Sequence, residues 1–360
     1  MKRIPTAQLV PGMTLGQNVL NFNHQMIVSK GTVLTDKLIT NLDAYGVLSV
    51  YIEEAPESTT DSATPVITQS PYSERIKNSP AFQQFKADYD HNIDSFQNTI
   101  NNMVEKNLQL DVKQLLVDSL QTITNANGQL GIMDMLHNMR EYDDSTFAHS
   151  MNVALICNVF AKWLKLNDEE TELATACGLL HDMGKILVPK EIIAKSGKLS
   201  AAEYASIQKH PVRGYELLYA QNVDPHICNA ALMHHERSDG SGYPCRLSGN
   251  QIDPYARMVA IADVYDAMTA ARVYRGPLCP FRVIELFESE GYQRYDVQYL
   301  LVFLENVVNT YVQNTCRLSD GREGEIIYIN REKFSRPMVK CGTEYINLLE
   351  HPELSIVELL

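Results

Sequence analysis

Histidine and acidic side chains that could bind metal recur through the middle of the chain. Six of the ten histidines fall between residues 149 and 235, and several adjoin an acid. The series runs in the order His149, His181-Asp182, His210, His234-His235-Glu236, Asp263 and Asp266. Neutral imidazoles mixed with carboxylates suit Fe, Mn, Zn or Ni. Because no cysteine takes part in the pattern, a cysteine-rich structural zinc site is not expected.

The number of these side chains favours two metal ions over one. Six or more protein ligands exceed what a single divalent ion takes when it must also keep a water, so two ions sharing an aspartate are expected. Such a pair can clamp both oxygens of a phosphodiester and generate a hydroxide nucleophile. A lone histidine on a helix is more often an ordinary core or surface residue, so no role is assigned to the remaining ones. These are His24, His91, His137, His226 and His351.

Three sequence motifs resemble the HD-GYP family, a subgroup of the HD metallohydrolases. They are HDMGK at 181–185, HHERSDGSGYP at 234–244 and ARMVAIADVYDAMTAARVYR at 256–275. The similarity extends over roughly residues 140–280. It implies a helical domain with a two- or three-metal centre, often of iron or manganese. It also implies hydrolysis of cyclic di-GMP to the linear dinucleotide pGpG or to GMP.

The resemblance carries over to individual residues. It implies catalytic roles for His181, Asp182 and Lys185, with Asp182 bridging the metals and Lys185 facing the scissile phosphate, where a cation can stabilise developing charge. The implied metal ligands are His149, His181, Asp182, His210, His234, His235 and Asp263.

The same resemblance implies a substrate pocket around the metals. The implied lining residues are Asp143, Lys185, Tyr243, Pro244, Asp266, Arg272 and Arg275. An arginine can bind a phosphate or a guanine edge through two parallel hydrogen bonds. Gly240, Gly242, Tyr243 and Pro244 form the signature loop of the second motif. Its two glycines are expected to let the backbone adopt positive φ and approach a ligand closely. The family also uses this loop to contact GGDEF-type diguanylate cyclases, whereas Arg237 and Asp239 are expected to hold it in place.

One position departs from the three-metal members of the family, which carry a glutamate four residues before the first ligand histidine. Here that position is Ser145. One helical turn before His149 is the correct face for a ligand, but a serine hydroxyl is a poor one. We therefore expect two ions, iron or manganese, and no third metal.

The predicted fold class is mainly α, with a helical HD-GYP domain, a small α+β N-terminal module and a β-rich C-terminal segment. The pattern of residues 1–53 predicts short strands around a helix at 36–46. These residues are expected to form the small α+β module, with a regulatory role. A Pro/Ser/Thr-rich linker follows at 54–72, then a helical connector at 73–137. The HD-GYP catalytic domain is expected at 138–315, including an amphipathic helix at 149–166, and the β-rich segment at 316–360.

Composition narrows the classes of partner. The net charge of −13 argues against binding of DNA or RNA, whose phosphates attract basic surfaces. No apolar run approaches the roughly 20 residues of a membrane helix. The seven scattered cysteines, without a CxxC, predict thiols and not a disulfide framework. A cytoplasmic location is expected, with cyclic di-GMP as the small-molecule partner, and a homodimer remains open.

Two other functions stay open at this stage. The hybrid cyclic GMP-AMP would undergo the same chemistry, and contacts to the base would decide between the two substrates. A non-catalytic module that senses the dinucleotide or recruits a protein is the alternative from another class. The signal read by residues 1–53 and the product, pGpG or GMP, are not fixed by the sequence.

Overall fold

The computed structural model describes most of the chain beyond residue 75 and parts of what precedes it. The described residues are 2–6, 9–10, 12–17, 19–20, 26–28, 30–35, 38–39, 42, 49–52, 76–106, 108–125, 128–139, 146–193, 195, 197, 199–270 and 277–360. The chain divides into two compact units, Met1–Thr68 and Gln69–Leu360. The predicted linker at 54–72 lies outside the described residues.

The first unit contains two short antiparallel strand pairs. Strand β1 (Lys2–Pro5) pairs with β4 (Ser49–Ile52), and β2 (Val19–Leu20) pairs with β3 (Met26–Val28). A small separate core includes Leu15, Leu34 and Leu42. Residues 38, 39 and 42 are helical, and the rest of the helix predicted at 36–46 lies outside the described residues.

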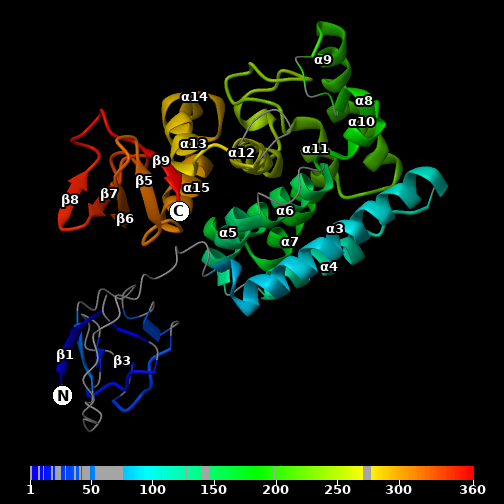
Figure 1. Cartoon of the computed structure of the whole chain (residues 1–360). Helices are drawn as coiled ribbons and strands as arrows, with labels where there is room; N and C mark the ends of the chain where they lie inside the picture. The colour runs from blue at the N-terminus through cyan, green and yellow to red at the C-terminus, as the bar shows by residue number, and fades with distance from the viewer. Residues whose placement is uncertain are drawn as a thin grey trace. The chain divides into compact units, whose positions relative to one another are not determined.

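The second unit is mainly helical, as the sequence predicts (Figure 1). Its α-helices are α3 (Pro80–Lys106), α4 (Val112–Asn125), α5 (Gly128–Met139), α6 (Thr146–Trp163), α7 (Asp168–Leu180), α8 (Lys190–Ile193), α9 (Ala201–Ile207), α10 (His210–Ala220), α11 (Pro225–Met233), α12 (Pro254–Thr269), α13 (Pro280–Leu286), α14 (Tyr292–Arg294) and α15 (Val297–Asn309). Shorter turns are the 3₁₀ segments η2 (Met183–Leu187) and η3 (Gly249–Gln251) and the π-helical η4 (Phe287–Gly291).

Polar residues cap the helices where the sequence places them. Asp111 accepts from the backbone N–H of Gln114 before the main body of α4. A capping box of Ser200 and Glu203 begins α9, and the side chain of Asp224 begins α11, which has proline at its first position. These side chains satisfy backbone N–H groups that have no partner within the helix, which fixes where each helix starts.

Helix α6 differs from the expectation of an amphipathic helix at 149–166. Every residue from Ala148 to Ala161 is buried. Helices α3, α4, α5, α7, α12 and α15 all pack against α6 and leave it no solvent face. Polar positions of this helix are buried as well. Asn152 accepts a hydrogen bond from Tyr89, and Asn158 donates one to Thr175.

The C-terminal segment forms one antiparallel sheet, confirming its predicted β content. The strand order is β8 (Glu344–Asn347), β7 (Met338–Cys341), β6 (Glu323–Tyr328), β5 (Thr315–Leu318) and β9 (Ile356–Leu359). Its inward face, which includes Leu318, Ile326 and Val339, belongs to the same hydrophobic core as the helices. None of the helices in the described part of the chain is both long and apolar enough to cross a membrane.

Gly184 sets how closely η2 approaches α10. A Cβ atom built on Gly184 would lie 1.9 Å from the carbonyl oxygen of His210 and 2.6 Å from the backbone nitrogen of Gly214. Both neighbours are backbone atoms, which cannot turn aside as a flexible side chain can. The absence of a side chain at Gly184 therefore lets Asp182, two residues earlier, approach His210.

We expect Gly184→Ala to lower the free energy of unfolding by about 1–3 kcal/mol, because the added methyl group forces η2 away from α10. Urea denaturation monitored by circular dichroism measures this change. Gly197→Ala is the matched control, since Gly197 is exposed and its Cβ would meet open space. Equal unfolding free energies for the two variants would contradict this account of the η2–α10 contact.

Candidate metal centre

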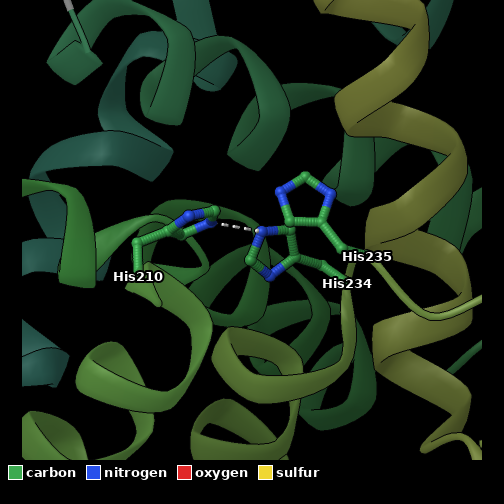
Figure 2. A group of neighbouring side chains, drawn as sticks. All are labelled: His210, His234 and His235. Atoms are coloured by element: carbon green, nitrogen blue, oxygen red, sulfur yellow. Dashed lines mark hydrogen bonds between the residues drawn. The ribbon is translucent and has the colours of Figure 1, made fainter. Parts of the chain in front are cut away.

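Six buried or nearly buried side chains from separate elements converge in the helical unit. His149 projects from α6, His181 and Asp182 follow α7, His210 begins α10, and His234 and His235 follow α11. Two groups each bring their ligand atoms within 4.8 Å of one another. One is His149, His181 and Asp182, and the other is His210, His234 and His235, drawn in Figure 2.

The carboxylate of Asp182 lies between the two groups. Its Oδ2 atom is 3.4 Å from Nε2 of His181 and 3.7 Å from Nε2 of His149. Its Oδ1 atom is 3.3 Å from Nε2 of His210 and 3.7 Å from Nε2 of His234. Each oxygen of one carboxylate thus faces a different pair of imidazoles, the arrangement that a bridging ligand requires.

The Nδ1 atoms of the same histidines point away from this centre and are already engaged. Nδ1 of His181 donates to the carbonyl oxygen of Gly178 at 2.7 Å, and Nδ1 of His210 donates to that of Ile207 at 2.7 Å. Nδ1 of His234 reaches the carbonyls of Ala230 and Ala231, both at 3.0 Å. A carbonyl only accepts, so each Nδ1 carries the proton, and the lone pair of each neutral ring is at Nε2.

Several atoms of this centre lack a suitable hydrogen-bond partner among the described residues. Nε2 of His181 and Oδ1 of Asp182 are buried without a hydrogen-bond partner there. Nε2 of His210 and Nε2 of His234 face each other at 3.2 Å, although both rings already carry their proton at Nδ1 (Figure 2). Buried polar atoms are rarely left without partners. Divalent cations bound at these nitrogens and carboxylate oxygens would satisfy all of them, so the donor set fits metal ions.

Electrostatics keep most of the centre in the state that metal binding requires. Burial, together with the neighbouring histidines, holds the pKa of His234 well below its usual value, and burial lowers the pKa of His235 to about 3. Burial alone would raise the pKa of Asp182, but Lys185 and His181 bring it well below its usual range. Neutral imidazoles and an ionised carboxylate are the forms that bind cations.

His149 is the exception among the four inward-facing histidines. Burial lowers its pKa, but hydrogen bonds to Asp263 and Asp266 outweigh this and raise the pKa to about 9. Its Nε2 atom is 3.0 Å from Oδ1 of Asp263, and its Nδ1 atom is 2.7 Å from Oδ2 of Asp266. A cation at Nε2 would replace only the proton shared with Asp263, because the bond to Asp266 lies on the other side of the ring.

Lys185 lies at the edge of the centre, on η2. Its Nζ atom is 2.5 Å from Oδ2 of Asp182, and a quarter of its side chain is exposed. The lysine is therefore paired with the carboxylate of Asp182 at one end of the centre and remains partly accessible to solvent.

The signature loop at 236–249 folds back over the second histidine group. The Tyr243 ring stacks on His235 with centroids 4.7 Å apart. Gly240 has φ +78°, the positive φ that was expected of this glycine. A Cβ on Gly242 would lie 2.5 Å from Cα of Glu236. The close approach that Gly242 permits in this structure is therefore to the protein's own backbone. Arg237 and Asp239 hold the loop, as predicted.

These holding contacts come from inside and outside the loop. Asp239 accepts from the backbone N–H of Ser241 at 2.9 Å. The guanidinium of Arg237 lies 4.7 Å from the centroid of Tyr295, and the N–H of Ser238 donates to the carbonyl of Arg294 at 2.8 Å. Helix α14 therefore anchors the beginning of the loop.

Three supporting residues were not identified in these roles from the sequence. Glu236 is buried, and its carboxylate accepts from the N–H of Cys245 at 2.6 Å and of Leu247 at 3.0 Å, across the loop. Asp266, expected to line the substrate pocket, is buried and bonded to the back of His149. Tyr89 on α3 donates at 3.2 Å to the carbonyl of Ala148, the residue before His149. In the sequence, Glu236 was marked by its adjacency to two histidines and Asp266 by its place in the histidine and acid series, whereas nothing marked Tyr89.

Four residues considered in the sequence lie outside the described residues. Asp143 and Ser145 precede α6, and Arg272 and Arg275 follow α12. The substrate-pocket roles of Asp143, Arg272 and Arg275 therefore remain predictions. So does the argument from Ser145 against a third metal.

Comparison with known proteins agrees with this centre. The model of the HD domain family matches residues 112–299, about half of the chain, so the chain belongs to the HD domain family. The HD-GYP identification made from the motifs is also confirmed. The 3'3'-cGAMP-specific phosphodiesterase 1 of Vibrio cholerae is 41% identical over 170 residues, 46% of this chain and 39% of the relative.

Two further relatives share a similar stretch. A cyclic di-GMP phosphodiesterase of Pseudomonas aeruginosa is 35% identical over 204 residues, 56% of this chain and 49% of its own length. The cyclic di-GMP phosphodiesterase response regulator RpfG of Xanthomonas campestris is 38% identical over 173 residues, 47% of this chain and 45% of its own length. The chain thus covers less than half the length of each of these three relatives.

We expect Glu236→Gln to lower the free energy of unfolding by about 1–3 kcal/mol, because the amide NH₂ must face a backbone N–H where a carboxylate oxygen now accepts. Hydrogen exchange of the Cys245 and Leu247 amides should become faster. Glu332→Gln, at an exposed glutamate, is the control and should change neither quantity. Unchanged exchange at both amides in Glu236→Gln would show that the carboxylate does not hold the loop.

Proposed function

We propose that this protein is a metal-dependent phosphodiesterase that hydrolyses cyclic di-GMP to pGpG or GMP. The observation that carries the proposal is the carboxylate of Asp182, whose two oxygens face two separate groups of histidines. The names of the relatives, all phosphodiesterases of cyclic dinucleotides, support this substrate class.

Two divalent ions, iron or manganese, would fit the proposed ligands. His149, His181, Asp182 and Asp263 would hold one ion, and His210, His234, His235 and Asp182 the other. Bound there, the ions would act as Lewis acids and lower the pKa of water enough for attack on phosphorus. A third ion is not proposed, since Ser145 offers no carboxylate.

The chain's own residues would position the substrate and stabilise the charge that develops on its phosphate. His181 and Asp182 fix the centre, and Lys185 would bind a non-bridging phosphate oxygen by leaving its contact with Asp182. Tyr243 stacks on His235, and Tyr243 and Pro244 would form one wall of the pocket. Asp143, Arg272 and Arg275 would complete the pocket, and Asp266 would act from behind His149.

Hybrid cyclic GMP-AMP is the second candidate substrate. It is favoured by the relative at 41% identity, whose name specifies that dinucleotide. A non-catalytic role is less favoured, because the full proposed ligand set is present. An α+β regulatory role for residues 1–53, binding of GGDEF-type cyclases by the signature loop, a homodimer and a cytoplasmic location stay predictions.

Asp182→Asn should abolish hydrolysis and reduce the metal content from two ions per chain to one or none, because a neutral amide cannot bridge two cations. Elemental analysis of anaerobically purified protein and product analysis with cyclic di-GMP and cyclic GMP-AMP in parallel test this. Asp320→Asn, an exposed aspartate of the C-terminal sheet, is the control. Full metal content together with full turnover in Asp182→Asn would refute the bridging role.

Lys185→Met should lower kcat by about 10²–10³-fold while the metal content stays unchanged, because the variant removes a charge that stabilises the transition state but is not a ligand. Steady-state kinetics and elemental analysis on the same sample distinguish this from loss of the centre. Lys340→Met, on strand β7, should retain wild-type kcat. A loss of metal in Lys185→Met would instead assign the lysine a structural role.

A further inference from the structure

A cavity separate from the metal centre lies between α13 and the C-terminal sheet. It has a volume of about 410 Å³, within the size range of small-molecule sites. Its walls come from residues 277–285, 335–336 and 352–357, all in the second unit. Helix α13 and strand β9 lie side by side at this point (Figure 1).

The cavity combines an apolar wall with a net positive charge. Leu278, Phe281 and Ile356 supply apolar surface. Two guanidinium groups share the single carboxylate of Glu285. Nη2 of Arg336 is 3.0 Å from Oε1, and Nη1 of Arg282 contacts Oε2. Among the described side chains that line the cavity, two cations and one anion leave one positive charge in excess, while the carboxylate of Glu288 lies behind Ser335.

The two arginines differ in how tightly they are held. The side chain of Arg336 is 14% exposed and also donates to the carbonyl of Leu354, so it belongs to the wall. The side chain of Arg282 is 58% exposed, and its guanidinium contacts Glu285. Arg282 can therefore turn to a new anion while Arg336 keeps Glu285 paired.

We propose that this cavity is an effector site for a small organic anion that carries a flat apolar ring. The ring would pack on the wall formed by Leu278 and Phe281, and the anionic group would bind Arg282 through paired N–H donors. The hydroxyl of Ser355 also lines the cavity and can donate to the same group.

The wall of the cavity is connected to the signature loop. Ser335 donates from its backbone N–H, at 3.4 Å, and from its hydroxyl to the carboxylate of Glu288 on η4. The η4 turn continues directly into α14, whose last residue, Arg294, accepts the N–H of Ser238. An anion that binds beside Ser335 and Arg336 thus acts on the elements that anchor the loop covering His235.

Binding is tested with phenyl phosphate, which combines a ring with an anionic group, by measuring how fast a thiol reagent alkylates Cys279. The Cys279 side chain lines the cavity, whereas Cys341 does not and serves as the internal reference. Phenyl phosphate should slow alkylation of Cys279 in a saturable way, and inorganic phosphate or phenol should do so far less. Because this readout is independent of hydrolysis, failure of the proposed activity would not affect it.

Two variants make the test specific. Arg282→Gln should weaken the protection by phenyl phosphate about tenfold, the loss expected for one charge-assisted hydrogen bond. Arg331→Gln, at an exposed arginine outside the cavity, should leave protection unchanged. No protection up to the solubility limit of the probe, or equal protection in Arg282→Gln, would overturn the site.

The effector role is tested by hydrogen exchange of the amides in residues 236–249 with saturating phenyl phosphate. Exchange should slow in wild-type protein, and this change should be lost in Arg282→Gln at the same probe concentration. Protection of Cys279 without any change in loop exchange would overturn the connection to the signature loop.

Discussion

The position of the Asp182 carboxylate is the constraint on which the rest of the centre depends. An ionised carboxylate buried this deeply needs compensating charge, since removing it from water costs several kcal/mol. The pKa values of Asp182 and Asp263 lie well below the usual range, so both carboxylates are ionised, and in the protein alone Lys185 pairs with Asp182 and the protonated His149 with Asp263. Cations at the centre would take over both balancing roles. We therefore expect metal binding to free Lys185 for the phosphate.

Helix ends solve the problem of aiming three imidazoles at one carboxylate. The last carbonyls of a helix have no N–H partner within it. Gly178, Ile207 and Ala231 offer such carbonyls, each three residues before one of the inward-facing histidines, whose Nδ1 donates to it. One local geometry, repeated at α7, α9 and α11, thus satisfies the helix end and turns Nε2 inward. A ligand placed by its own helix end needs little support from distant residues.

The sequence allowed prediction of what is local. Helix caps at Ser200 and Asp224, the clustered histidines and the mainly helical fold class follow from spacing within a few residues. What it did not reveal depends on long-range packing. Asp266 meets His149 across 117 positions, and the burial of α6 on all sides needs six partner helices that no local pattern shows. Gly242 was noted, but the backbone that it must approach appears only when the loop closes.

The C-terminal sheet is physically part of the helical unit. Leu318, Ile326 and Val339 share one continuous hydrophobic core with helices of the second unit, α6, α12 and α15 among them, so the sheet and the helices bury each other's apolar faces. Glu285 on α13 bonds Arg336 of the sheet segment, and Glu288 on η4 bonds Ser335. The η4 turn leads directly into α14, which anchors the signature loop. A close-packed core has few voids and transmits strain to the elements that pack against it. Movement of the sheet must therefore be accommodated at α13 and η4. The loop over His235 is an element that can yield, since it is fixed by hydrogen bonds and two ring contacts, Tyr243 on His235 and Arg237 on Tyr295.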